Sequence, residues 1–438
     1  MKNKRYRAPL WLILGLFALV ALTACSGIVA NSQVADSATT GSGVADEADT
    51  GLPEAAVASE EAEVSDGPAA EPVTIDSVDD RSPRLRQLTA DWNTDFSKHS
   101  VSYDEILSGG PPRDGIRSID NPKFIGNDEA ADWLADNEPV IALELNDDAR
   151  AYPLQIITWH EIVNDTVGDV PAVITFCPLC NSALAFDRRV GDQVFEFGVS
   201  GLLRNSDLIM YDRTTETLWQ QFTGDAIVGE LTGERLTFLP TSIVSFRDFR
   251  DAHPDGQVLS QDTGLRGGYG SNPYAGYDTY DHVLSAGGNL ALFQGETDGR
   301  LEPAARVVTV SLDGQGIDIA YPYAVLEQVG VVNDSRDGQD LVVFFTPGTA
   351  SALGARVIAD AEDVGATGVF DPNLDGQKLI FRVEDGQILD DQTGSAWNIL
   401  GQAIEGPLAG ESLEHIVHGD HFWFSWAAFK PDTIIYQS

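Results

Sequence analysis

The alternation of apolar and polar residues along the chain predicts mainly β structure. In residues 141–145 and 308–312, apolar side chains occupy alternate positions, which is the pattern of a strand with one buried face. Residues 172–176 and 341–345 are short, nearly continuous apolar runs, as expected of strands that are buried on both faces. Frequent Asn-Asp, Asp-Gly and Gly-Asp pairs indicate turns between such strands.

Helical patterns are few and short. The spacing of apolar residues favours helices over residues 128–137, 242–252 and 323–329. We therefore predict a mainly β fold with minor helices.

The chain contains an internal repeat. Residues 139–184 and 308–353 align without a gap at a constant offset of 169. Among the matching segments are Ala151-Tyr152-Pro153 with Ala320-Tyr321-Pro322, Val163-Asn164-Asp165 with Val332-Asn333-Asp334, and, across small gaps, Asp212 to Trp219 with Asp391 to Trp397. The repeat predicts two homologous copies of one β-rich domain, residues 81–262 and 304–438, forming a pseudo-symmetric pair. A Gly/Tyr-rich connector, residues 263–303, joins them.

The first residues resemble an export signal. A basic start with Lys2, Lys4, Arg5 and Arg7 is followed by an apolar run over residues 10–22 and by Leu22-Thr23-Ala24-Cys25. This run is shorter than the roughly 20 apolar residues of a membrane-spanning helix, and its flanks are those of a secretory signal. Its end resembles the lipobox of bacterial lipoproteins. We expect residues 1–24 to be removed and Cys25 to become the lipidated N-terminus.

The following segment, residues 25–80, predicts a disordered acidic tether. It is rich in Ala, Ser, Thr, Gly, Asp and Glu and contains no aromatic residue, so it cannot bury enough apolar surface to offset the entropy of ordering. The protein is thus expected in the cell envelope, held by its lipid on the extracytoplasmic side of a membrane.

The charge of the chain excludes one class of partner. The formal net charge is −41 at pH 7. Removal of residues 1–24, which hold four of the 27 basic residues and none of the 68 acidic ones, changes it to −45. So negative a protein repels nucleic acid. The sequence identifies no protein partner.

The candidate chemistry lies in the first copy. Once Cys25 is lipidated, Cys177 and Cys180 are the remaining thiols, in the segment Cys177-Pro-Leu-Cys-Asn181. His160 precedes them in the same copy. At the constant offset the second copy has Val329, Thr346 and Thr349 in place of His160, Cys177 and Cys180. This difference is expected if one copy carries a working site and the other serves as a scaffold.

A Cys-x-x-Cys pair has three physical uses, which the sequence leaves open. With His160 as a third donor it suits copper or zinc, with Asn181 at a turn position that favours a left-handed backbone; a fourth position is open or taken by Asp187, Asp212 or His253. As a redox dithiol it would make the protein an extracytoplasmic thiol–disulfide oxidoreductase. As a permanent disulfide it would brace a loop in a ligand-binding module.

Two further features are candidates for binding. Arg204, Asp207, Asp212 and His253 are polar residues that could line a pocket in the first copy. The connector, with Tyr269, Tyr274, Tyr277 and Tyr280, could lie across the first copy as a lid or serve as a plain linker.

Several of these motifs together resemble a known prokaryotic family. They include Trp159-His160 before Val163-Asn-Asp, Thr175-Phe-Cys-Pro-Leu-Cys-Asn-Ser-Ala, Phe197-Gly-Val-Ser-Gly-Leu-Leu, Tyr211-Asp-Arg, Gly229-Glu-Leu, His253-Pro, Leu259-Ser-Gln-Asp-Thr-Gly, and Trp423 and Trp426. In order, they resemble the family catalogued as domain of unknown function 3179. The resemblance implies an exported or membrane-associated protein with this Cys-Pro-x-Cys pattern. It implies no particular activity.

Overall fold

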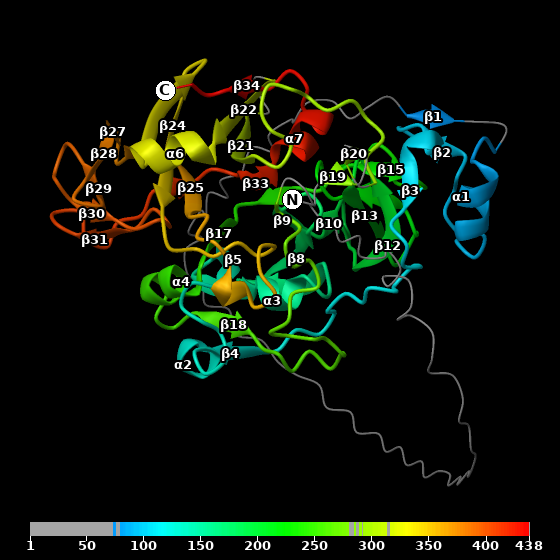
Figure 1. Cartoon of the computed structure of the whole chain (residues 1–438), viewed down its shortest axis with the longest axis horizontal. Coiled ribbons are helices and arrows are strands. Elements are labelled where there is room, and N and C mark those ends of the chain that lie inside the picture. Colours follow the sequence, from blue (N-terminus) through cyan, green and yellow to red (C-terminus); the bar gives the residue numbers. More distant parts are fainter. Residues whose placement is uncertain are drawn as a thin grey trace, which may run out of the picture. The chain divides into compact units, whose positions relative to one another are not determined.

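The computed structural model describes residues 73–75, 79–279, 284–285, 289–290, 292–312 and 316–437. The fold is mainly β, with 41% strand and 12% helix, and its sheets are arranged like a propeller (Figure 1). All described residues belong to one compact unit. The predicted signal sequence, the predicted lipidation site Cys25 and most of the predicted tether lie outside the described residues.

Three sheets come from the N-terminal half of the body. Sheet 1 consists, in spatial order, of β17 (Ser242–Ser245), β5 (Pro139–Leu145), β6 (Asp148–Pro153), β18 (Gln257–Leu259) and β4 (Phe124–Gly126). Sheet 2 consists of β16 (Phe238–Leu239), β9 (Ser182–Asp187), β8 (Val170–Cys177) and β7 (Ile162–Val167). Sheet 3 consists of β1 (Thr74–Ile75), β2 (Lys98–His99), β15 (Ala226–Val228), β14 (Leu218–Gln220), β13 (Asp207–Asp212), β12 (Phe197–Arg204) and β3 (Ile106–Ser108).

Three further sheets come from the C-terminal half. Sheet 4 consists of β33 (Gly419–Phe422), β21 (Arg306–Leu312), β22 (Ile317–Pro322) and β34 (Ile434–Ile435). Sheet 5 consists of β23 (Val331–Arg336), β24 (Gln339–Thr346), β25 (Ala366–Asp371) and β32 (Glu414–His415). Sheet 6 consists of β28 (Phe381–Glu384), β29 (Gln387–Asp390), β30 (Ala396–Trp397) and β31 (Ala403–Glu405).

The two sets of sheets have the same order of strands. In sheets 1 and 4 the first three strands are antiparallel and the next pair is parallel. Sheets 2 and 5 are antiparallel throughout. In sheets 3 and 6 the register shifts at the same place, beside Trp219 and Trp397.

Side-chain contacts also recur in both halves. The Tyr152 hydroxyl donates to Asp165 over 2.7 Å, and the Tyr321 hydroxyl donates to Asp334 over 2.9 Å. A Trp in β14 and a Trp in β30 each donate an indole N–H to an aspartate: Trp219 to Asp212 and Trp397 to Asp390, both over 3.1 Å. The counterpart of Asp212 is therefore Asp390, and the alignment with Asp391 was one residue out of register.

Short helices and hairpins complete the fold. The helices are α1 (Pro83–Leu88), α2 (Asn127–Ala130), α3 (Leu154–Ile157), α4 (Phe246–Ala252), α6 (Tyr323–Val329) and α7 (Trp423–Phe429), with 3-10 turns at Tyr103–Glu105 and Ile358–Asp360. The two-stranded hairpins are β10 (Arg189–Val190) with β11 (Gln193–Val194), β19 (Leu284–Ser285) with β20 (Asn289–Leu290), and β26 (Asn373–Leu374) with β27 (Gln377–Lys378).

The predicted helices were placed with mixed accuracy. The helix over residues 323–329 is confirmed. The one over 242–252 begins only at Phe246, because Ser242–Ser245 pairs with β5 and the Ser245 hydroxyl caps the helix by accepting from the Asp248 N–H. The one over 128–137 is a single turn that starts at Asn127. α7 follows β33 and was not predicted.

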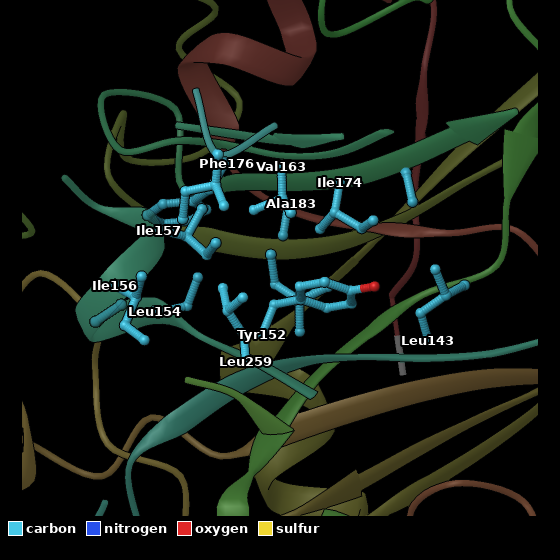
Figure 2. Packing of buried hydrophobic residues seen from close by; sticks show 14 of the residues in the cluster. Leu143, Tyr152, Leu154, Ile156, Ile157, Val163, Ile174, Phe176, Ala183 and Leu259 are labelled. Atoms are coloured by element: carbon cyan, nitrogen blue, oxygen red, sulfur yellow. The ribbon is translucent and has the colours of Figure 1, made fainter. Parts of the chain in front are cut away.

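The central strands are buried on both faces. In β8, Ile174 and Phe176 pack in a cluster with residues of sheet 1, including Leu143 and Tyr152 (Figure 2). The opposite face of β8 carries Val173 and packs against sheet 3. This two-sided burial confirms the interpretation of the continuous apolar runs. It also means that the end of β8, residue 177, lies between two layers.

Strands from the two halves lie against each other. β9 of sheet 2 contacts β33 of sheet 4, and β17 of sheet 1 contacts β25 of sheet 5. At the first of these contacts the Phe422 N–H donates to the Cys180 carbonyl over 2.9 Å. The Cys-x-x-Cys turn of the N-terminal half is thus bonded directly to a strand of the C-terminal half.

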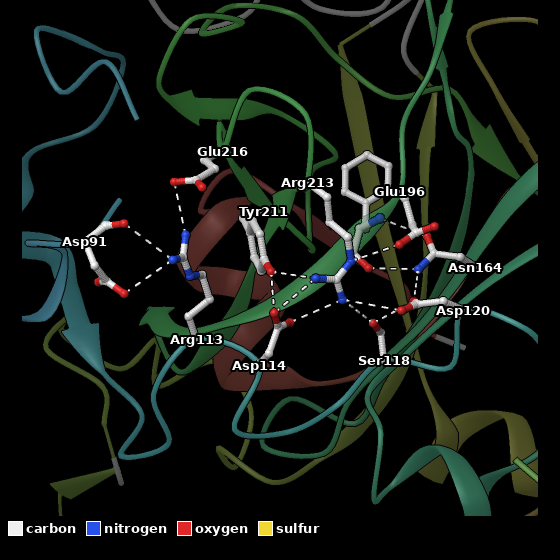
Figure 3. A network of polar contacts seen from close by, with 11 residues as sticks. Asp91, Arg113, Asp114, Ser118, Asp120, Asn164, Glu196, Tyr211, Arg213 and Glu216 are labelled. Atoms are coloured by element: carbon white, nitrogen blue, oxygen red, sulfur yellow. Dashed lines mark hydrogen bonds and ion pairs between the residues drawn. The ribbon is translucent and has the colours of Figure 1, made fainter. Parts of the chain in front are cut away.

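A polar network fixes the segment that precedes sheet 1. The Arg213 guanidinium bonds to Asp114 and Ser118 over 3.0 and 2.9 Å and pairs with Asp120 over 3.5 Å (Figure 3). Asn164 in β7 donates to the same Asp120 over 2.8 Å. These contacts anchor residues 114–120 on sheets 2 and 3.

None of the helices in the described part of the chain combines the length and apolar composition that crossing a bilayer requires.

We predict that Asn164→Ala destabilises the protein more than Asn333→Ala does. Each Asn side chain bonds to both backbone groups of a phenylalanine, Phe197 or Phe381, over 2.8–2.9 Å. Asn164 is buried, whereas Asn333 is exposed, so water can replace only the second side chain. We expect a loss of about 1–3 kcal/mol for Asn164→Ala and less for Asn333→Ala, measured by urea unfolding. Equal losses of unfolding free energy in the two variants would contradict this prediction.

Candidate metal site at the Cys177–Cys180 turn

The two cysteines lie in a tight hairpin turn between β8 and β9. Cys177 ends β8 and pairs with Ser182, the first residue of β9. The Cys180 N–H donates to the Cys177 carbonyl over 3.2 Å. Asn181 has a φ of 52°, so the predicted left-handed turn position is confirmed. Both cysteines are thiols and both are buried. The turn therefore directs two sulfur atoms to the same side.

Asp207 supplies a third donor atom next to the sulfurs. It is the first residue of β13 and follows a two-residue turn in which Asn205 and Ser206 both have positive φ values, 51° and 66°. One ligand atom from each of Cys177, Cys180 and Asp207 lies within 4.8 Å of the other two. The arrangement brings together a hairpin of sheet 2 and a hairpin of sheet 3.

Several buried polar atoms around this group have no hydrogen-bond partner among the described residues. Asp207 Oδ2 accepts from Gln220 Nε2 over 2.6 Å and from the Phe222 N–H over 3.0 Å, but Oδ1 has no partner. The same is true of Ser182 Oγ, Gln220 Oε1 and Gln221 Oε1. Buried polar atoms without partners are rare in folded proteins. Their presence together is typical of a place where a further group binds.

His160 is not part of this group. Its Nδ1 is 2.7 Å from the Arg117 carbonyl, and its Nε2 is 2.6 Å from the Tyr269 hydroxyl. Both ring nitrogens are therefore engaged. The donor atoms that lie together are those of Cys177, Cys180 and Asp207. Asp207, and not the predicted His160, is therefore the third donor of this group.

Glu161, the neighbour of His160, was missed in the sequence. It is buried, and the Tyr274 hydroxyl donates a hydrogen bond to its carboxylate. Its φ is 59°, in a region that residues other than glycine rarely adopt. The residue 169 positions later is Gly330, with a φ of 70°. The sequence contains one signal for this residue: the first copy has a glutamate where the second copy has a glycine.

Burial favours the protonated forms of the groups of the site. Desolvation raises the pKa of Cys177 and raises that of Cys180 well above its ordinary value. Desolvation also raises the pKa of Asp207 to about 7 and that of Glu161 to about 8, because a charged form is costly where water is excluded. A bound cation would reverse this effect and replace the protons.

The connector covers the turn. Residues 263–279, here called the tyrosine strap, run across the site: the Tyr277 hydroxyl donates to the Leu179 carbonyl over 3.1 Å, and the Trp159 indole N–H donates to the Ser271 carbonyl over 3.2 Å. The strap is also bonded to the C-terminal half through Asn272, whose side chain donates to the Ala352 carbonyl over 2.8 Å. This part of the connector is a packed cover. Tyr280 lies outside the described residues.

The four residues considered as a pocket are not all gathered at one place, although Arg204 and Asp207 are paired across the β12–β13 hairpin. Arg204 forms an ion pair with Glu105 over 2.7 Å. Asp212 is buried in the turn that it caps. His253 lies 3.8 Å from Glu144, and burial lowers the pKa of its imidazole. Of the four, Asp207 alone belongs to the group around the sulfurs.

The C-terminal half holds three further histidines, of which His418 and His421 are buried and His415 is partly buried. His415, His418 and His421 each have one ring nitrogen without a partner among the described residues. The rings of His415 and His418 stack with centroids 5.1 Å apart. Burial lowers the pKa of His415 and of His421 to about 3, so they are neutral at physiological pH. Their nitrogens do not form a group as compact as the one around the cysteines, which among the described residues is Cys177, Cys180 and Asp207.

A comparison with protein families gave one match. The family model described as "Protein of unknown function (DUF3179)" matches residues 113–433, which include the turn, Asp207, Glu161 and the strap. The comparisons with curated proteins and with solved structures gave no match.

We predict that Asp207→Asn stabilises the metal-free protein increasingly as the pH rises. The folded-state pKa of Asp207, about 7, exceeds its ordinary value of 3.8. The wild type therefore loses stability as the pH rises from about 4 to about 7, because the unfolded chain ionises first. The Asp207→Asn variant does not show this loss of stability, because an asparagine side chain does not ionise.

The measurement is the unfolding midpoint of both proteins, in the presence of a chelator, across this pH range. Neutral His415 and His421 act in the opposite direction, since their low folded pKa values reduce stability below pH 6.5. They are common to both proteins and cancel in the difference. A difference that does not depend on pH would contradict the prediction.

Proposed function

The chain belongs to the DUF3179 family, and we propose that it is a lipid-anchored extracytoplasmic protein that binds Zn²⁺ through Cys177, Cys180 and Asp207. The observation that carries the proposal is the convergence of three buried donor atoms within 4.8 Å, beside an Asp207 oxygen that has no partner among the described residues.

The donor types favour zinc over copper. Zn²⁺ binds thiolate and carboxylate ligands in tetrahedral sites, whereas Cu⁺ is selected by soft sulfur donors. Two sulfurs and one carboxylate oxygen suit Zn²⁺ better than Cu⁺. Three protein ligands leave one tetrahedral position for a water molecule or a further ligand.

The charges are consistent with a metal that displaces protons. With two thiolates and one carboxylate, the donors carry three negative charges in a place from which water is excluded. A bound divalent cation reduces the net charge of the site to one negative charge. Binding at neutral pH would release the thiol protons, so the affinity should rise with pH.

The repeat supports a single site on a duplicated framework. We propose that the halves are two copies of one domain arranged as a pseudo-symmetric pair, since their strand orders match. The positions that correspond to Cys177 and Cys180 hold Thr346 and Thr349. Asp207 follows the β12–β13 turn, and the equivalent β28–β29 turn is followed by Gln387, which is exposed. The second copy thus lacks all three donors.

The burial of the thiols weighs against a thiol–disulfide enzyme. Exchange needs an accessible thiolate, whereas Cys177 is 2% exposed, Cys180 is 0% exposed, and burial raises both pKa values. A metal that enters once and stays is compatible with this enclosure.

Purified wild-type protein, refolded or loaded under reducing conditions, is expected to hold about one zinc ion per chain, measured by elemental analysis. The Cys177→Ser/Cys180→Ser variant is expected to hold none. The matched control is Thr346→Ser/Thr349→Ser, which changes the corresponding positions and should bind like the wild type. Equal, negligible metal in the wild type and the cysteine variant would exclude the proposal.

The proposed location rests on the sequence before residue 26. We predict that Cys25→Ser moves the protein from the membrane fraction to the soluble extracytoplasmic fraction, because the lipid on this residue supplies the anchor. Cell fractionation and immunoblotting measure the distribution. An unchanged membrane fraction would show that the lipid is not the anchor.

A further inference from the structure

Glu161 combines two unfavourable features: a left-handed backbone, which its counterpart Gly330 adopts without a side chain, and a buried acid. Its backbone is left-handed, which costs about 1 kcal/mol or more for a residue with a side chain, and its carboxyl group is buried. At Gly330 a Cβ atom would lie 2.5 Å from Val383 Cγ2, so a side chain there would have to displace Val383. The N-terminal half provides room for a side chain at the equivalent position and fills it with an acid.

The backbone of Glu161 is tied to the cysteine turn. Its carbonyl accepts from the Phe176 N–H over 2.8 Å, and Phe176 precedes Cys177. A negative charge on Glu161 contributes to the raised pKa of Cys177, and a negative charge on Asp207 contributes to the raised pKa of Glu161. The carboxyl group therefore belongs to the same buried environment as the three donors.

The Glu161 carboxylate does not belong to the set of atoms within 4.8 Å of one another. It is therefore too far from some of these donors to be counted as a ligand with them. A carboxylate that is not a direct ligand can still act on a metal by forming a hydrogen bond to a water molecule that the metal binds. Tyr274 donates a hydrogen bond to the carboxylate and restricts its orientation.

We propose that Glu161 holds a water molecule at the fourth coordination position of the Cys177–Cys180–Asp207 site and thereby selects Zn²⁺ over Cu⁺. This rests on the proposed function. Four-coordinate Zn²⁺ keeps a water where the protein gives three ligands. Cu⁺ is selected by soft sulfur ligands and does not need that water. A carboxylate that bonds to the water stabilises the zinc complex alone.

The test compares the affinities for the two metals in the full-length protein in detergent. Glu161→Gln keeps the size of the side chain and removes its charge. We expect its Zn²⁺ dissociation constant to rise by about 10- to 100-fold, as for other outer ligands of metal sites, with the Cu⁺ affinity unchanged. Competition with chromogenic chelators measures both, with Cu⁺ handled anaerobically. Tyr274→Phe should give a smaller loss of the same kind.

The matched control is Glu138→Gln. Glu138 is another buried glutamate with a pKa raised by desolvation, and its side chain accepts from Gln155 and from the Ala135 N–H, outside the donor group. This variant should bind both metals like the wild type.

A second variant separates selection from folding. Glu161→Gly places at residue 161 the amino acid that occurs at 330. The metal-free protein should melt at the same or a higher temperature than the wild type, while Zn²⁺ binding weakens and Cu⁺ binding persists. A lower melting temperature with equal losses for both metals would show a structural role and overturn the proposal.

The outcomes distinguish the two proposals. A wild type that binds no zinc excludes the proposed function and the role of Glu161 together. A wild type that binds zinc, with Glu161→Gln binding it equally well, excludes the role of Glu161 alone.

Discussion

The burial of β8 on both faces is the constraint on which the rest of the structure depends. One face packs against sheet 1 and the other against sheet 3. The strand therefore delivers Cys177 into an interlayer space from which water is excluded. The hairpin of sheet 3 that closes this space brings Asp207. Because each layer limits the position of the next, the donors are set by two tight hairpins, β8–β9 and β12–β13.

The same burial determines the chemistry. Exclusion of water shifts the thiols and carboxylic acids of the site toward their neutral forms. A cation that binds there would replace their protons. Four carboxylic acids of the N-terminal half, Glu138, Glu161, Asp207 and Asp248, have pKa values raised by desolvation. Glu138 is satisfied by protein donors, whereas Asp207 keeps an oxygen without a partner among the described residues. That difference separates a structural carboxyl group from a candidate ligand.

Much of the fold could be predicted from local patterns, because period-two alternation and apolar runs report burial directly. The left-handed turn at Asn181 followed from the same kind of local argument. The third donor could not be predicted this way. Asp207 reaches the sulfurs through the packing of sheet 3 on sheet 2, which no spacing along the chain encodes. His160 was assigned because it is a common ligand, but its partner proved to be Tyr269 of the strap, 109 residues later.

The hydrogen bond from the Phe422 N–H to the Cys180 carbonyl has a consequence for biosynthesis. The turn obtains this partner from β33, in which Phe422 follows Cys180 by 242 residues. During synthesis the Cys180 carbonyl therefore waits for its partner until β33 has been added. The cysteine turn cannot reach its final set of hydrogen bonds from the N-terminal half alone.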